Sequence, residues 1–144
     1  MALVELRFSP LPAHVRTARL VAAAVARRAG LDDAVLDEVR LAVGEACSRA
    51  VELHRRHCPS DPVTVTLDDG GSAFAVAVAD RVSQDPKAAE HPLETITNEA
   101  DLDTEALPAG VGLAVITGLV DDLEVEPVNG GAVVRMTWPV PPAA

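Results

Sequence analysis

Two amphipathic helical patterns follow each other directly near the start of the chain, and strand patterns lie on both sides of the pair. In residues 13–29 apolar side chains recur at steps of three and four, and Gly30 ends the pattern. The second pattern is longer: Asp32 or Asp33 can cap its start, and basic residues gather at its end, in residues 55–57. Because the helices come as a block instead of alternating singly with strands, this order predicts an α+β two-layer sandwich, with a mixed or antiparallel sheet covered on one face by helices.

The strand patterns are short, and most of them pair into hairpins. Residues 3–8 alternate apolar and polar side chains, which is typical of a half-buried strand. Residues 62–67 and 73–79 flank Asp68-Asp-Gly-Gly71, a strong local signal for a β-hairpin. A short apolar helix is expected at about residues 112–120, and two last strands, at residues 123–127 and 132–138, enclose a turn.

Residues 81–109 interrupt this order. They hold three prolines and seven acidic residues without a sustained apolar period, which is long for a connection inside a compact domain. A segment of this kind is a lid, a binding segment or disorder. We therefore expect residues 1–144 to form a single domain, with residues 81–109 as a lid-like loop within it.

Composition excludes several classes of protein. A formal net charge of -10 argues against nucleic-acid binding, which depends on clustered Lys and Arg. Two cysteines, Cys47 and Cys58, are too few for the disulfide framework of a small secreted protein and favour a reducing cytoplasm. The chain contains no run of eighteen apolar residues and no signal-peptide pattern, so we expect a cytoplasmic protein with no membrane association.

Three short segments carry the candidate chemistry: Glu45-Ala-Cys-Ser-Arg-Ala-Val51, Val78-Ala-Asp-Arg-Val82 and Gly110-Val-Gly-Leu-Ala-Val-Ile116. Glycines just before a helix let backbone amides approach phosphate oxygens, where the helix N-terminus adds favourable partial charge. Together with the ending, in residues 118–124 and 130–135, these segments resemble the anti-sigma-factor serine kinases of bacteria. That family belongs to the GHKL superfamily of ATPases and has the Bergerat, or histidine kinase-like ATPase, fold.

The resemblance implies a role for each matching position. Glu45 would be the general base that activates a serine hydroxyl on a partner protein. Asp80 would accept a hydrogen bond from the adenine amino group of ATP or ADP, and Gly110, Gly112 and Leu113 would hold the nucleotide. The family has an Asn that helps to hold Mg²⁺ at the position of Arg49, a glycine at that of Val82, and usually a basic residue at that of Val111.

Arg49 is the departure with the largest chemical effect. A guanidinium has five donors, no acceptor and a permanent charge, so it cannot ligate a cation that prefers oxygen. Four residues apart on a helix, Glu45 and Arg49 are expected to pair, which would lower the proton affinity of Glu45 and make it a poorer base. The alternative is an exposed ion pair worth only ~0.3 to 0.5 kcal/mol. Val82 adds a β-branched side chain that resists positive φ.

Metal binding by cysteine and histidine is not indicated. Cys47, His54, His57 and Cys58 supply ligand types, but their spacing on one helix lacks the paired ligands of a zinc site. A core cysteine and a polar helix end account for them better, and no metal site is predicted.

The resemblance implies regulation of transcription by protein contact, in which the domain holds a sigma factor and an anti-sigma-factor antagonist competes for it. The altered motifs favour sequestration with decayed ATP and Mg²⁺ chemistry. The alternative is an active Mg-ATP-dependent serine kinase that phosphorylates the antagonist, with Arg49 contacting phosphate. A second alternative is a scaffold that pairs with a kinase paralogue, and a homodimer is compatible with both leading interpretations.

Overall fold

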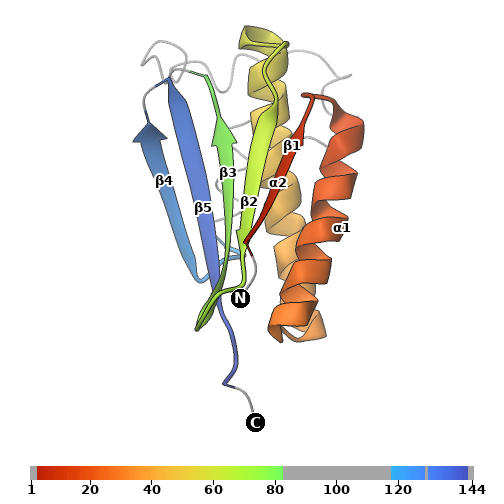
Figure 1. Cartoon of the computed structure of the whole chain (residues 1–144), viewed down its shortest axis with the longest axis vertical. Helices are drawn as coiled ribbons and strands as arrows, with labels where there is room; N and C mark the ends of the chain where they lie inside the picture. The colour runs from red at the N-terminus through yellow and green to blue at the C-terminus, as the bar shows by residue number, and fades with distance from the viewer. Residues whose placement is uncertain (1–2, 83–117, 129, 143–144) are drawn as a thin grey trace.

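The computed structural model describes residues 3–82, 118–128 and 130–142. The elements follow in the order β1 (Leu3–Phe8), α1 (Pro12–Ala29), α2 (Asp33–His57), β2 (Val63–Asp68), β3 (Ala73–Asp80), β4 (Asp122–Val128) and β5 (Gly131–Pro139) (Figure 1). The predicted block of two helices and the predicted hairpin between residues 62 and 79 are thereby confirmed. The lid-like loop expected at residues 81–109 lies outside the described residues from residue 83 onward.

The five strands form one sheet in the order β1-β2-β3-β5-β4, and every described pair of neighbours is antiparallel. The register places one row of apolar side chains straight across the sheet: Leu6, Val65, Val78, Val134 and Val125. The central members of the row are buried, whereas Val125 on β4 is 44% exposed. The sheet is therefore well covered at its centre and open at its β4 edge.

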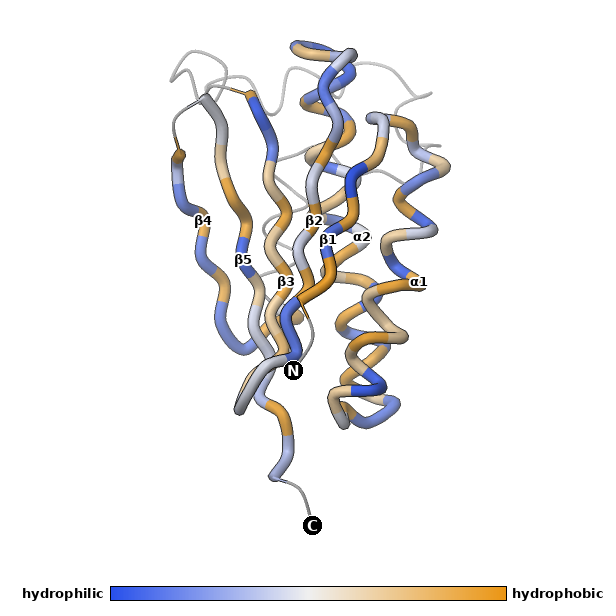
Figure 2. Tube along the Cα trace, in the orientation of Figure 1, coloured by the Kyte–Doolittle hydropathy of each residue, from blue (hydrophilic) through white to orange (hydrophobic). Residues whose placement is uncertain are grey.

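Helices α1 and α2 pack against each other and cover one face of the sheet over β2 and β3 (Figure 1). Apolar and polar residues alternate along β2 and β4, as Figure 2 shows by hydropathy, because each of these strands has one face toward the core and one toward solvent, whereas β3 is apolar up to Asp80. Neither described helix has the long apolar run needed to cross a membrane. The architecture is the predicted α+β sandwich. The largest fully buried side chains of its core include Trp138, Phe74, Leu36, Leu67 and Met136.

Local signals begin and end the helices. Pro12 occupies the first turn of α1, where its missing N–H costs nothing, so the helix starts one residue before the predicted residue 13. Gly30 ends α1 with a left-handed φ of 104°. Of the two aspartates proposed as the cap of α2, Asp32 has that role, since its carboxylate accepts the N–H of Val35 at 3.0 Å.

Strand bounds differ from the predicted ones by one residue, and one helix differs more. Strand β3 extends to Asp80, so this carboxylate belongs to the last ladder position of the strand. The apolar helix predicted for residues 112–120 does not reach Val120, because Gly118 and Leu119 form a turn. That turn is held by the indole N–H of Trp138, which donates to the carbonyl oxygen of Leu119 at 3.3 Å. The earlier part of the predicted helix lies outside the described residues.

Strand β4 lies at one edge of the described sheet and is exposed along most of its length. Asp122, Glu124 and Glu126 alternate with Leu123 and Val125, so the three carboxylates share the face opposite the helices. Pro127 adds a residue without a backbone N–H near the end of the strand.

Candidate functional site

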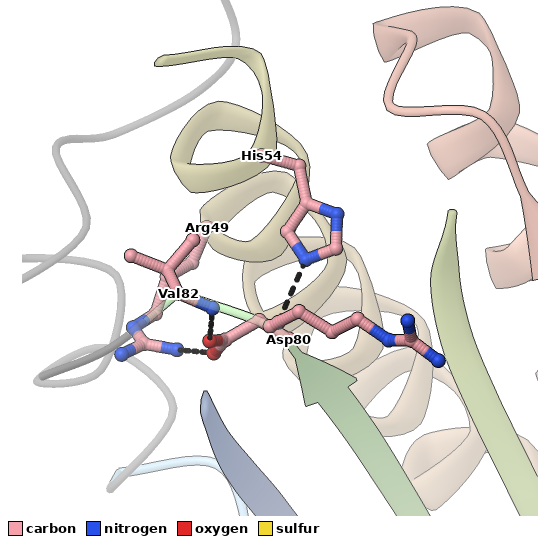
Figure 3. A network of polar contacts seen from close by, with 5 residues as sticks. Arg49, His54, Asp80 and Val82 are labelled. Carbon is pink, nitrogen blue, oxygen red and sulfur yellow. Dashed lines mark hydrogen bonds and ion pairs between the residues drawn. The ribbon is translucent and has the colours of Figure 1, made fainter. Parts of the chain in front are cut away.

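The end of β3 meets the second half of α2 in a buried ion pair. The guanidinium Nη1 of Arg49 donates to Oδ2 of Asp80 at 3.1 Å (Figure 3). The two side chains are 7% and 0% exposed, so both charges are removed from water. Such a pair is held together strongly because each partner would otherwise be an uncompensated charge in the interior.

Asp80 also binds the backbone that follows it. Its Oδ1 accepts the N–H of Val82 at 3.0 Å, so each carboxylate oxygen has a donor within the chain. The start of β5 passes so close that a Cβ at Gly131 would overlap the carbonyl oxygen of Asp80. This close approach explains why position 131 carries glycine, and it fixes the end of β3 against β5.

His54 is fully buried one turn of α2 further on and uses both ring nitrogens. Its Nε2 accepts the N–H of Arg81 at 3.0 Å, and Nδ1 lies 2.8 Å from the carbonyl oxygen of Asp61. Because Nε2 is an acceptor, the proton of the neutral ring is on Nδ1, from which it is donated to Asp61. His54 therefore joins α2, the loop before β2 and the residue after β3. Figure 3 shows its ring beside the end of β3.

Glu45, one turn before Arg49, has a different environment. The residue is partly buried, and its Oε2 is shielded from solvent without a hydrogen-bond partner among the described residues. Burial raises the pKa of this carboxyl above its ordinary value, and the positive charge of Arg19 on α1 opposes the rise. The side chain of Arg19 lies over Gly44, where a Cβ would lie 2.8 Å from its Cδ.

The predicted pairing of Arg49 with Glu45 is wrong, and so is the alternative of an exposed ion pair on the helix surface. Arg49 lies on the face of α2 that packs toward β3, and there it meets Asp80, which is 31 residues away in sequence. Without that partner, the pKa of Glu45 is raised and not lowered. The spacing of four residues on a helix permits a contact, but tertiary packing decides which partner is used.

The two cysteines are free thiols, and burial raises the pKa of Cys47 to about 12. The pKa of Cys58, the C-cap of α2, is also raised, first by burial and then by the charges of Asp61 and Asp80. Among the described residues no three His, Cys, Asp or Glu side chains are grouped to hold a metal ion.

The remaining candidates divide into two groups. Glu45, Arg49 and Asp80 lie in the described part of the chain, and the structure brings Arg49 and Asp80 together but not Glu45 and Arg49. Gly110, Gly112 and Leu113, as well as Val111, lie outside the described residues. Their expected contact with phosphate stays a prediction.

The donor set suits an internal ion pair better than Mg-ATP. Arg49 offers only N–H donors at the position where a magnesium ligand would need an oxygen. The two oxygens of Asp80, which would face the adenine amino group, already accept from Arg49 and Val82. Val82 has no positive φ and is 8% exposed, so a branched side chain fills the place after the strand.

Sequence reasoning missed His54 as a member of this site. Its sequence context predicts a polar helix end, yet the structure buries it completely. The signal was its position: His54 lies seven residues after Cys47 and four after Ala50, both buried, and therefore on the apolar stripe of α2. A histidine at such a position must satisfy both nitrogens internally, which indicates a fixed polar contact.

A family model and a related protein both place the chain in one family. Residues 8–138 match the family model described as the histidine kinase-like ATPase domain. The chain is 30% identical over 138 residues to the serine-protein kinase RsbW of Bacillus pumilus (strain SAFR-032), a match that covers 94% of this chain and 84% of that protein. The family match spans both helices and the sheet from the end of β1 into β5.

A solved structure supports the fold. The structure of the RsbU and RsbW domains of Rv1364c from Mycobacterium tuberculosis matches 99% of this chain with a TM-score of 0.67 and 18% sequence identity. The chain spans about a third of that protein, 34% of its length.

Proposed function

The chain belongs to the histidine kinase-like ATPase domain family, in the branch of the anti-sigma-factor serine kinases, and from this premise we propose that it sequesters a sigma factor by protein contact. In this proposal the nucleotide site no longer supports Mg-ATP chemistry. An antagonist protein competes for the same surface, and release of the sigma factor depends on that competition.

The buried Arg49–Asp80 pair is the observation that carries the proposal. It supports a decayed site because it joins two of the positions to which the resemblance assigns ATP and Mg²⁺ contacts. To bind adenine through Asp80, the chain would have to rearrange a carboxylate that is 0% exposed and leave Arg49 without its partner. Holding a partner needs surface and shape, not catalysis, so loss of the nucleotide leaves sequestration possible.

The alternative function is an active serine kinase, and one observation favours it. Glu45 has a shielded carboxylate oxygen that has no partner in the described part of the chain, and its pKa is raised; both suit a general base that takes a proton from a serine hydroxyl. In that case Arg49 would leave Asp80 and contact phosphate directly. The two functions differ in whether Mg-ATP binds.

The test uses the purified full chain in two measurements. Calorimetric titration with ATP and ADP, with and without Mg²⁺, is expected to show no saturable binding at millimolar nucleotide. A tagged chain expressed in its own cells is expected to co-purify with a sigma factor that is identified by mass spectrometry.

The control for these measurements is Glu45→Gln, which removes the candidate base and is expected to capture the same sigma factor. Magnesium-dependent transfer of phosphate to an antagonist serine, lost in Glu45→Gln, would establish the kinase instead. Recovery of neither a sigma factor nor an antagonist would contradict sequestration.

A further inference from the structure

Three consecutive residues at the end of β3 are each held by a group within the chain. The side chain of Asp80 pairs with Arg49, the N–H of Arg81 donates to His54, and the N–H of Val82 donates to Asp80. Figure 3 shows Arg49, His54, Asp80 and Val82 together at this end of β3. Backbone donors beyond the end of a strand have no ladder partner and need a side chain or water instead, and here side chains satisfy two in succession.

We propose that Arg49 and His54 form an internal clamp that holds residues 80–82 in one conformation without any nucleotide. The clamp consists of Arg49 and His54 on α2 and the groups of Asp80, Arg81 and Val82 that they bind directly or through Asp80. The clamp goes beyond the proposed function. Only its expected effect on sigma-factor capture rests on that function.

Both holding residues come from one rigid element. Arg49 and His54 are five residues apart on α2, and the residues between and before them, such as Ala46, Cys47 and Ala50, are buried in the core. The helix therefore positions the guanidinium and the imidazole together, with no loop that could let one move independently. The carbonyl oxygen of Asp61 binds the far side of the imidazole and keeps its Nε2 directed at Arg81.

The chemistry of each holding group suits a permanent contact. Arg49 brings a guanidinium to the Asp80 carboxylate, a donor that is complementary to it in charge and geometry. Its withdrawal would leave the Asp80 carboxylate buried without a counter-charge. His54 is fully buried, and its two bonds require the tautomer with the proton on Nδ1, which leaves Nε2 as the acceptor for Arg81.

A clamp of this kind makes the order of residues 80–82 independent of ligand. A carboxylate at the end of a strand that binds adenine would have the ligand as its partner. Here the partner of Asp80 is Arg49, a residue of the same chain, so it is present at the site whether or not a nucleotide is in solution. Capture of a sigma factor, if it depends on this end of the sheet, is then insensitive to ATP and ADP.

The test is amide hydrogen exchange, measured by NMR on the full chain in the absence of nucleotide. The amides of Arg81 and Val82 are expected to be protected, with the same exchange rates after addition of millimolar ATP and Mg²⁺. His54→Leu removes the acceptor and is expected to speed exchange at Arg81 by about tenfold or more. Arg49→Met is expected to do the same at Val82.

Two comparisons separate the clamp from general loss of stability. His54→Gln keeps an acceptor near the position of Nε2 and is expected to restore part of the protection at Arg81. The amide of Val65, at the centre of the sheet, reports global stability, and Arg135→Met serves as a surface control. Unprotected Arg81 and Val82 in the wild-type chain, or protection that appears only with nucleotide, would overturn the clamp.

The outcomes for the clamp and for the proposed function are distinguishable. Nucleotide-independent protection without any captured sigma factor would retain the clamp and reject sequestration. Capture of a sigma factor by a chain whose residues 81 and 82 are ordered only by ATP would do the reverse.

Discussion

Two ion pairs of the described sheet each join an arginine to a carboxylate, but one pair is buried and the other is exposed. Arg49 and Asp80 lie 3.1 Å apart, with side chains 7% and 0% exposed. Arg135 on β5 and Glu126 on β4 lie 3.6 Å apart, with side chains 46% and 60% exposed. The separations differ little, but water screens the second pair and not the first.

The difference shows that burial, and not proximity, determines what such a contact does. The exposed pair can break and reform with little change in free energy, because water solvates both partners when the pair is broken. The buried pair cannot lose one partner without leaving a charge in the core, so its presence constrains the end of β3. The exposed pair contributes little to the structure, whereas the buried pair limits which conformations the end of β3 can adopt.

Removal of one partner from each pair is expected to separate the two regions most strongly. Arg49→Met keeps a long apolar stem but leaves the Asp80 carboxylate buried without its counter-charge, and we expect it to lower the free energy of unfolding by about 3 to 5 kcal/mol. Arg135→Met is expected to change it by less than about 0.5 kcal/mol. Urea denaturation followed by circular dichroism measures the free energy of unfolding of both variants. Equal losses would contradict the larger contribution assigned to the buried pair.

A second comparison uses two valines that face each other across neighbouring strands. Val134 on β5 is fully buried, whereas its ladder partner Val125 on β4 is 44% exposed. Val134→Ala removes two methyl groups from the core and is expected to cost about 2 kcal/mol, including the cavity that it leaves. Val125→Ala is expected to cost less than about 0.5 kcal/mol. A similar cost at both positions would show that β4 is covered in solution.

The smallest expected effect concerns Glu45, whose Oε2 is shielded and has no hydrogen-bond partner among residues 3–82, 118–128 and 130–142. Its pKa in the folded chain is raised, so its contribution to stability is present at low pH and is lost as the pH rises through the folded pKa. Glu45→Gln should therefore melt slightly above the wild type at pH 7, with the difference disappearing near pH 4. The gain is small because the carboxyl is only partly buried.

The matched control is Glu52→Gln on the same helix, which removes an exposed ion pair to Arg56. It is expected to lower stability at pH 7 by about 0.3 to 0.5 kcal/mol, opposite in sign to Glu45→Gln. Scanning calorimetry between pH 4 and pH 8 measures both variants. A lower melting temperature for Glu45→Gln at pH 7 would contradict the assigned direction of the pKa.

The sequence predicts the elements of this fold well because their signals are local. The aspartate cap at Asp32, the glycine stop at Gly30 and the turn after Asp68 all depend on residues within a few positions of each other. The order of helices and strands then leaves few arrangements that bury every apolar face. The same local reasoning placed the bounds of the strands within one residue.

The candidate site was less predictable because its contacts are long-range. Two carboxylates on α2, Glu45 and Glu52, lie within one turn of Arg49, and only the packing of α2 on the sheet reveals that Asp80 is the partner. His54 and Arg81 are 27 residues apart, and one of the two bonding groups is a backbone N–H, which carries no sequence signal. The residue types identified Arg49 and Asp80 as candidates but did not show that they pair, and they did not identify His54.

The composition of β4 has a consequence for the behaviour of the protein at high concentration. An exposed edge strand offers unpaired backbone groups on which neighbouring molecules can add strands and begin to aggregate. The three carboxylates of β4, at Asp122, Glu124 and Glu126, would meet the same charges in a second copy, and Pro127 interrupts the row of donors. The charges and the proline of β4 therefore disfavour the addition of a further strand at this edge of the described sheet.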